Sequence, residues 1–291
     1  YPENAAIKEG HTMCSVAVEK KKMVLPFEMW SMDKFKKEQQ ITTWLKQYKG
    51  PFVISAKVDG VSAGYSTMGD KPTLFTRGNG RVGQDISHAI PYLNLPTKKG
   101  IEMRGELLMK KDVFETNWSD KFANVRNMIA GTANAKESFP ERWNDIDFVA
   151  YEVITPELTP SQQFKFLEKQ KTVTVINKRF KKFSKNTLSR HLVDWRENYD
   201  YDIDGIIVAD NHTYPRTSKN PKHAFAFKMV LGDQVVESKV VNVIWSPSKD
   251  GYLKPKVQVQ PVTLGGAVIQ YATLHNAEFV IKNKIGIGAT V

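Results

Sequence analysis

The sequence predicts an α+β protein, in which a large unit of mixed strands and helices precedes a small unit built from strands. Three observations support this prediction. Four strand-like segments occur between residues 52 and 109, periodic helical segments lie on both sides of them, and short alternating strands follow Gly232 and Asp233. The last pattern is typical of a small barrel or sandwich. We therefore expect one domain over residues 1–230 and a second over residues 231–291.

Each element of the large unit is predicted from its residue pattern. A first helix is expected over residues 33–48, because Asp33 is a candidate N-cap and Gly50-Pro51 would end the helix. The expected strands are residues 52–57, 61–66, 73–77, 101–109, 148–153 and 203–208, and the further helices are residues 111–118, 125–135, 161–170 and 188–199. The segment of residues 224–230 is expected to complete the large unit. The small unit has expected strands at residues 235–245, 254–261 and 268–271.

The composition is that of a globular protein with excess positive charge. Of 291 residues, 41% are hydrophobic and 25% are charged, which is enough for a packed core. The 42 Lys and Arg residues outnumber the 31 Asp and Glu residues, and the net charge of +11 favours a polyanionic partner such as nucleic acid. The single cysteine, Cys14, excludes an internal disulfide and a four-cysteine zinc site. Because no apolar run reaches the roughly 18 residues of a membrane span, no membrane partner is expected.

The stretch whose residues most clearly suggest catalytic chemistry is Ser55-Ala-Lys-Val-Asp-Gly60. Strand-like segments on both sides would hold the amine of Lys57 on a rigid sheet, and Asp59-Gly60 is a turn dipeptide of the hairpin kind. A lysine fixed beside a carboxylate suits a covalent nucleophile if its surroundings favour the neutral amine, since the ordinary lysine pKa is ~10.4. The alternative is a surface lysine beside a hairpin turn, because so short a motif also occurs by chance.

A glycine-rich loop follows the third expected strand. Residues 77–83 read Arg-Gly-Asn-Gly-Arg-Val-Gly. Such a backbone can approach a phosphate or a nucleotide closely, but it can equally be a flexible connector.

Several motifs occur in a specific order along the chain. Lys57-Val-Asp-Gly60 matches the Lys-x-Asp-Gly signature of covalent nucleotidyltransferases, which include DNA ligases, RNA ligases and capping enzymes. The motifs that follow are Thr76-Arg-Gly-Asn-Gly80, Met103-Arg-Gly-Glu106, Phe122-Ala-Asn-Val-Arg-Asn127, Phe148-Val-Ala-Tyr151, Asp204-Gly-Ile-Ile-Val208, residues 217–228 and Ala272-Thr-Leu-His-Asn-Ala277. From about residue 24 onwards, the series resembles the NAD-dependent DNA ligases. The last two motifs favour that branch over ATP-using relatives.

The resemblance implies both a fold and a reaction. The fold would be the ATP-grasp-like nucleotidyltransferase fold of DNA ligases, with antiparallel sheets and flanking helices, followed by an incomplete oligonucleotide-binding (OB) barrel. Lys57 would take AMP from NAD, AMP would pass to the 5′-phosphate of a DNA nick, and the 3′-hydroxyl would displace it. Such displacements at phosphorus require positioning and charge neutralisation, here with Mg²⁺ or Mn²⁺.

The resemblance also implies roles for residues that match the motifs. Lys57 would be the nucleophile, and Tyr151 would stack on adenine. Asp59 would orient the lysine or bind the metal, and Glu106 would contact the ribose or the metal. The implied catalytic residues are Lys57, Asp59, Glu106 and Lys228; the nucleotide-binding residues are Ser55, Val58, Arg77, Glu106, Tyr151 and Lys228; the residues implied to contact DNA or phosphate are Arg126 and Arg196.

For some of these residues a structural role is an open alternative. Asp59 could serve as a turn residue, and Glu106 could be a solvated carboxylate at a strand end. Tyr151 could belong to the core, and Arg196 could be a surface charge on a helix.

The sequence departs from the family pattern at four positions. Ala209 stands where the family has lysine, and Ser55 stands where it has glutamate. Both positions would lie near the adenine, so we hypothesise that the two losses compensate each other and that other groups recognise the base. Asn134 replaces a family arginine, and Asn79 replaces the aspartate of the glycine loop.

Two other functions are alternatives to an NAD-dependent ligase. One is an ATP-dependent polynucleotide ligase or a capping-type nucleotidyltransferase, and the other is a non-enzymatic nucleic-acid-binding module. The expected partner is nicked duplex DNA, the expected state is monomeric, and the expected location is the cytoplasm, with the nucleus or a viral factory as alternatives. Residues 1–22 do not resemble the small N-terminal domain of the family, and its C-terminal modules would follow Val291, so we expect either a fragment without these modules or a reduced viral or phage enzyme.

Overall fold

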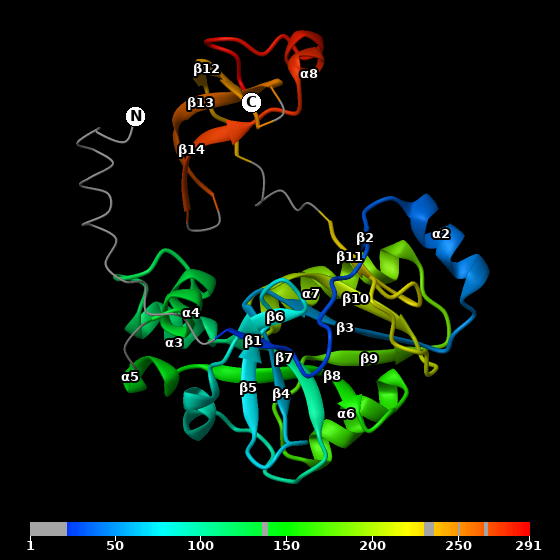
Figure 1. The fold of residues 1–291 in the computed structure, drawn as a ribbon. Coiled ribbons are helices and arrows are strands. Elements are labelled where there is room, and N and C mark those ends of the chain that lie inside the picture. Colours follow the sequence, from blue (N-terminus) through cyan, green and yellow to red (C-terminus); the bar gives the residue numbers. More distant parts are fainter. Residues whose placement is uncertain (1–21, 136–138, 230–235, 250, 265–266) are drawn as a thin grey trace. The chain divides into compact units, whose positions relative to one another are not determined.

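The computed structural model describes residues 22–135, 139–229, 236–249, 251–264 and 267–291. The chain forms two compact units (Figure 1). One comprises residues 1–118 and 125–228, and the other comprises residues 119–124 and 229–291. Cys14 lies outside the described residues.

Two sheets form the centre of the large unit. The five-stranded sheet has the order β2-β11-β10-β3-β9, with β2 Lys34–Phe35, β3 Phe52–Val58, β9 Asn177–Phe180, β10 Ile203–Asp210 and β11 Ala224–Phe227. The four-stranded sheet has the order β5-β4-β7-β8, with β4 Val61–Ser66, β5 Thr73–Thr76, β7 Glu102–Leu108 and β8 Asp147–Thr155. A small antiparallel pair joins β1 Lys22–Val24 to β6 Val82–Gln84. The pairing is antiparallel except between β2 and β11.

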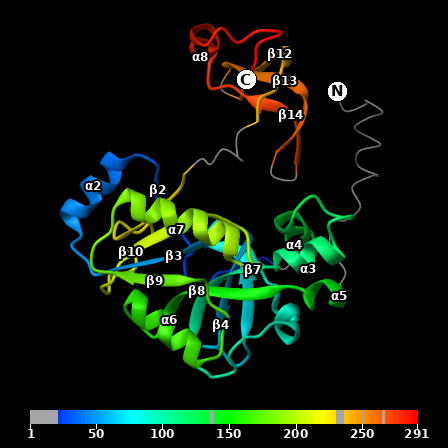
Figure 2. The ribbon, with the colours of Figure 1, turned by 180° about the vertical axis from the view of Figure 1, so that it is seen from behind.

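Helices flank these sheets, as the α+β prediction requires. They are α2 Glu38–Gln47, the 3₁₀ helix η1 Ser87–Tyr92, α3 Lys111–Asn117, α4 Val125–Ala133, α5 Pro140–Trp143, α6 Pro160–Lys169 and α7 Lys185–Asn198. Helix α7 packs against β10 (Figure 2), and its periodic residues Leu188, Leu192 and Trp195 are fully buried. Their burial explains why helical periodicity identified this segment.

The predicted start of the first helix is wrong. Residues 34–35 form strand β2 beside β11, and α2 begins only at Glu38. Asp33 does not cap the helix, because its carboxylate accepts hydrogen bonds from Asn220 at 2.9 Å and Lys222 at 2.8 Å. Partners distant in the sequence therefore override the local capping pattern.

The predicted hairpin at Asp59-Gly60 is also wrong. Strand β3 pairs with β10 and β9, whereas β4 pairs with β5 and β7, so the chain crosses from one sheet to the other between them. A Cβ atom on Gly60 would meet the carbonyl oxygen of Leu107. This crossing needs glycine for close approach to the neighbouring sheet.

The second unit contains a three-stranded antiparallel sheet. Its elements are β12 Val240–Pro247, β13 Leu253–Leu264, β14 Ala267–Thr273 and α8 Ala277–Lys282, with the order β12-β13-β14. Its core consists of Val240, Val257, Val259, Leu274 and Val280. The strand expected from residue 235 begins at Val240, and Val235 itself lies outside the described residues. The OB barrel remains a prediction.

None of the helices in the described part of the chain combines the length and apolar character needed to cross a bilayer.

Candidate active site

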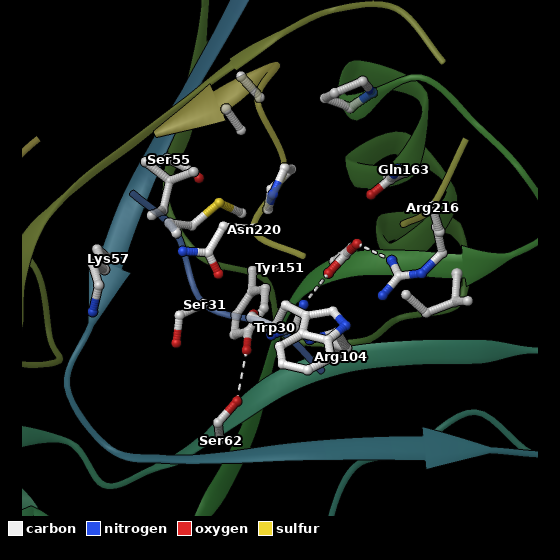
Figure 3. A pocket seen from close by; sticks show the side chains of 18 of the residues that line it. Trp30, Ser31, Ser55, Lys57, Ser62, Arg104, Tyr151, Gln163, Arg216 and Asn220 are labelled. Atoms are coloured by element: carbon white, nitrogen blue, oxygen red, sulfur yellow. Dashed lines mark hydrogen bonds and ion pairs between the residues drawn. The ribbon is translucent and has the colours of Figure 1, made fainter. Parts of the chain in front are cut away.

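Both sheets of the large unit line a cavity of about 1350 Å³. Figure 3 shows Ser55 and Lys57 on β3 and, across the cavity, Tyr151 and Arg104. The predicted site residues in its lining are Ser55, Lys57, Val58, Arg77, Glu106, Arg126, Tyr151 and Lys228. Asp59 and Arg196 are outside this lining as the described residues define it. The fold therefore brings together predicted site residues up to 173 positions apart in the sequence, from Ser55 to Lys228.

Lys57 and Lys228 share one carboxylate, that of Asp204. The Nζ atom of Lys57 lies 3.1 Å from Asp204 Oδ1, and the Nζ atom of Lys228 lies 2.6 Å from Oδ2. All three side chains are only about a quarter exposed, with values of 29%, 25% and 26% for Lys57, Asp204 and Lys228. A carboxylate at this distance can orient the amine and accept a proton from it.

A β-bulge explains how Asp204 reaches both lysines. Ile203 is opposite Val58 and Gly205 is opposite Lys57, so Asp204 is the extra residue between the two pairs. Bulges redirect side chains and often occur beside active sites.

Glu106 is a cavity carboxylate whose acidity is altered by burial. It lies two residues after Arg104 on β7, so both side chains are on one face of the strand. Burial raises the pKa of Glu106 to about 7, against the lowering effect of the charges on Lys57, Arg126 and Arg104. Near pH 7 this carboxyl group is therefore partly protonated, and a pKa shifted in this way is common for functional carboxyl groups.

Arg126 connects α4 to the crossing between the sheets. Its Nη1 atom donates to Asp59 Oδ1 at 2.5 Å, and the two side chains are 58% and 43% exposed. Asp59 therefore forms an ion pair with the Arg126 guanidinium in addition to its position at the chain crossing.

Tyr151 also occupies a β-bulge. Gly105 is opposite Ala150 and Arg104 is opposite Glu152, which leaves Tyr151 as the extra residue. Its hydroxyl group lies 2.9 Å from that of Ser62, and the guanidinium of Arg104 lies 5.6 Å from its ring centroid. The bulge lets both Tyr151 and its neighbour Glu152 line the cavity.

The glycine-rich loop is a closed turn in this structure. Gly78 and Gly80 have positive φ angles of 52° and 96°, and the Asn79 side chain accepts backbone bonds from Arg81 and Val82 at 3.0 and 2.8 Å. Asparagine therefore closes this turn without the family's aspartate. Just before the turn, Arg77 donates to the Ser31 hydroxyl at 3.0 Å.

Arg196 does not line the cavity as the described residues define it, and its side chain contacts the backbone of β10. Its Nε donates to the Ile203 carbonyl, adjacent to Asp204, at 3.3 Å. Its two terminal nitrogens are buried and have no hydrogen-bond partner among the described residues. Its contact with phosphate stays a prediction.

The departures Ser55 and Ala209 lie on neighbouring strands of the cavity floor. Ser55 is opposite Ile207 and Ala209 is opposite Val53, and both departures line the cavity. Ser55 is 7% exposed. Asn134 also lines the cavity, where its side chain donates to the Ala130 carbonyl at 2.8 Å.

The protein donors available for a metal ion are few. Within the described residues there is no group of three or more His, Cys, Asp and Glu side chains that could hold an ion. Mg²⁺ commonly binds through one or two carboxylates together with substrate phosphates and water. The metal contacts of Asp59 and Glu106 stay a prediction.

Sequence reasoning missed several residues of this site, and four of them are charged residues discussed here. Asp204, Arg104, Glu152 and Arg216 all line the cavity, although the first two belong to motifs already recognised. Arg104 could have been found, because it shares a strand face with Glu106. Glu152 and Arg216 have no motif signal, since a bulge and a tertiary contact place them.

Comparison with solved structures supports the fold. The structure named Pmar-Lig_PreS3 superposes with a TM-score of 0.55 at 15% identity, covering 89% of this chain and 61% of that chain. The predicted nucleotidyltransferase fold of DNA ligases is confirmed for this chain.

Comparison with known sequences identifies the family. The family model described as NAD-dependent DNA ligase adenylation domain matches residues 19–230. The chain is 40% identical over 288 residues to a DNA ligase of Acanthamoeba polyphaga mimivirus, covering 94% of this chain and 44% of that protein. It is 28% identical over 279 residues to a DNA ligase of Leptospira interrogans, covering 87% of this chain and 40% of that protein. The chain thus spans less than half the length of these relatives. The resemblance predicted from the sequence is confirmed, and this chain belongs to the NAD-dependent DNA ligase adenylation domain family.

Proposed function

We propose that this chain is the catalytic core of an NAD-dependent DNA ligase, with an adenylation domain over residues 1–230 and part of an OB domain over residues 231–291. The observation that carries the proposal is the position of Lys57 in the cavity, between Asp204 and the wall that holds Glu106 and Tyr151. A non-enzymatic binding module would not need this arrangement.

The first step forms a bond between Lys57 and AMP. The lone pair of the neutral Nζ attacks the AMP phosphorus of NAD, a nitrogen–phosphorus bond forms, and nicotinamide mononucleotide leaves with the electrons of the broken phosphorus–oxygen bond. Asp204 is placed to align the amine and receive its proton, since its carboxylate lies 3.1 Å from Nζ. Lys228 and Arg77 supply positive charge for the phosphate.

The next two steps transfer AMP and seal the nick. An oxygen of the DNA 5′-phosphate attacks the same phosphorus, and the bond to Lys57 breaks. The 3′-hydroxyl oxygen then attacks the 5′-phosphate, loses its proton and displaces AMP. Arg126 and Arg196 are assigned to phosphate contacts in these steps. The net charge of +11 suits nicked DNA as a partner.

The proposed mechanism includes a divalent ion. Asp59 and Glu106 would hold Mg²⁺ or Mn²⁺ together with phosphate oxygens, and the ion would neutralise charge on the transferred group. Removing divalent ions with a chelator should abolish AMP transfer, and adding Mg²⁺ should restore it.

The test of this proposal compares the two nucleotide donors. The protein is incubated with Mg²⁺ and either NAD or ATP, each labelled in the AMP moiety, and the label retained after denaturation is measured. NAD should label the wild-type protein and not Lys57→Ala. Labelling by ATP alone would instead indicate an ATP-dependent enzyme, and no labelling by either donor would favour a binding module.

The sealing activity needs its own measurement. A nicked duplex with a labelled 5′-phosphate should be converted to a sealed strand by the AMP-loaded protein. Loading without sealing would restrict the function of this chain to AMP transfer. A monomeric state and a cytoplasmic, nuclear or viral-factory location stay predictions.

A further inference from the structure

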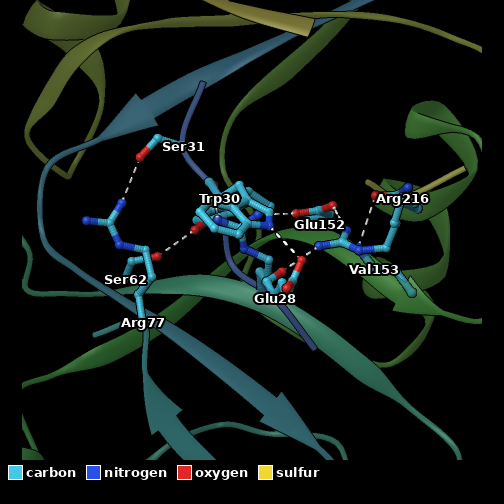
Figure 4. Close-up of polar contacts among 11 residues, drawn as sticks. Glu28, Trp30, Ser31, Ser62, Arg77, Glu152, Val153 and Arg216 are labelled. Atoms are coloured by element: carbon cyan, nitrogen blue, oxygen red, sulfur yellow. Dashed lines mark hydrogen bonds and ion pairs between the residues drawn. The ribbon is translucent and has the colours of Figure 1, made fainter. Parts of the chain in front are cut away.

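One carboxylate joins several parts of the cavity wall. Glu152 of β8 follows the bulge residue Tyr151, and its two oxygens accept from different arginines. Arg104 of β7 donates to Oε2 at 2.9 Å, and Arg216 donates to Oε1 at 2.5 Å. Figure 4 shows Arg216 reaching Glu152 from the β10–β11 connection, which comprises residues 211–223. Most of this connection lines the cavity.

The same arginines reach a third part of the wall, the segment of residues 25–33. Arg104 donates its second terminal nitrogen to the Trp30 carbonyl at 3.1 Å. Arg216 donates its second terminal nitrogen to the Glu28 carbonyl at 2.8 Å. Arg216 therefore bridges strand β8 and the 25–33 segment while it belongs to the β10–β11 connection.

The charges in this group favour a fixed geometry. Burial acts to raise the pKa of Glu152, but Arg104 and Arg216 outweigh it and hold the pKa below its usual range. The Glu152 side chain is 25% exposed and that of Arg216 is 40% exposed. Charge-assisted bonds from a planar guanidinium to two acceptors restrict orientation more than a bond from a lysine does.

The ends of the β10–β11 connection have other anchors. Near its start, Tyr214 donates to Asp210 at 2.7 Å and stacks on His223 with ring centroids 4.2 Å apart. Near its end, Lys222 donates to Asp33 at 2.8 Å. In the middle, Ser218 bonds to the Glu28 side chain, but within the described part of the chain it is Arg216 that ties this middle part to a sheet strand.

We propose that Arg216 is a positioning residue that holds the middle of the β10–β11 connection against the nucleotide cavity by binding Glu152 and the Glu28 carbonyl together. The inference rests on the proposed function only in taking the adenine nucleotide as the occupant. Arg216 acts through the wall that it positions, not on the reacting phosphorus. Its loss should therefore weaken nucleotide binding and leave the chemical step at saturation nearly unchanged.

The test measures equilibrium AMP binding by calorimetry in the 291-residue chain and in variants. Arg216→Met should weaken AMP binding about tenfold, because part of the free energy of nucleotide binding must then order the wall. Arg216→Lys can reach one acceptor but not both, so it should weaken binding about threefold. Arg190→Met, which removes an exposed arginine of α7, is the charge-matched control and should bind like wild type.

Two further readouts separate positioning from general stability. The rate of AMP attachment at saturating NAD should stay within about twofold of wild type while the KM for NAD rises about tenfold. Hydrogen exchange in Arg216→Met should accelerate at residues 213–219 and not in α7.

Each outcome decides a different claim. AMP affinity equal to wild type in Arg216→Met, or in Arg216→Lys where the first variant does not fold, would overturn the positioning role. A lower rate of AMP attachment at saturating NAD in Arg216→Met, with an unchanged KM for NAD, would show that Arg216 only stabilises the fold. Absence of AMP attachment in the wild type would remove the proposed function, while the binding measurement would still decide the role of Arg216.

Discussion

The raised pKa of Glu106 makes a quantitative prediction about stability. Burial raises this pKa from the ordinary 4.5 to about 7, so the folded protein retains a proton that the unfolded chain releases. Below pH 4.5 the group is protonated in both states and contributes nothing. As pH rises from 4.5 through 7, folding requires proton uptake, and the folded state loses stability.

The size of the effect follows from the two pKa values. At about 1.4 kcal/mol per pH unit, the difference between 4.5 and about 7 corresponds to roughly 3 kcal/mol above pH 7. Glu106→Gln keeps the shape of the side chain but cannot ionise. Its free energy of unfolding relative to wild type should therefore rise by about 3 kcal/mol between pH 4.5 and pH 8.

Urea unfolding, followed by tryptophan fluorescence at several pH values, measures this difference. The fully buried Trp143 and Trp195 report on the large unit. Glu168→Gln, at an exposed position on α6, is the matched control and should give a flat difference. A flat difference for Glu106→Gln as well, or one that falls with pH, would refute the conclusion that burial outweighs the surrounding cations.

Three further predictions concern the crossing, the shared carboxylate and the cavity floor. Gly60→Ala should destabilise the protein by about 2 kcal/mol or more, measured by urea unfolding, because the added methyl group meets the Leu107 carbonyl; an unchanged midpoint would contradict the close approach. Asp204→Asn should slow AMP attachment to Lys57 at least tenfold with little change in melting temperature, since the amide cannot hold both lysines; a wild-type rate in rapid-quench experiments would exclude this role. Ser55→Glu alone should lower the free energy of unfolding by about 2 kcal/mol, and adding Ala209→Lys in the same chain should restore at least about 1 kcal/mol of that loss. Additive effects of the two changes on unfolding, together with a normal rate of AMP attachment in the double variant, would argue against a compensated change.

The sequence predicted those helices and strands in which the pattern of apolar residues within the element matches its buried face. The apolar run before Lys57 belongs to the buried interior strand β3, and the spacing of Leu188, Leu192 and Trp195 matches the buried face of α7. Strand β9, Asn177–Phe180, escaped prediction because it is polar and partly exposed; its backbone pairing with β3 makes it a strand.

Site residues could be predicted where a motif carried them, but their geometry could not. Lys57, Glu106 and Lys228 were found from motifs, whereas the bulges that direct Asp204 and Tyr151 depend on the register between strands. Register is fixed by packing across the whole sheet, and single-sequence patterns do not show where an extra residue is inserted.

The most direct test of the central claim is the mass of the Lys57 peptide after incubation with NAD and Mg²⁺. The account predicts a gain equal to one AMP, located on Lys57 by fragmentation and lost on mild acid treatment, as expected for a nitrogen–phosphorus bond. A bare Lys57 peptide under these conditions, or AMP attached to a different residue, would contradict it.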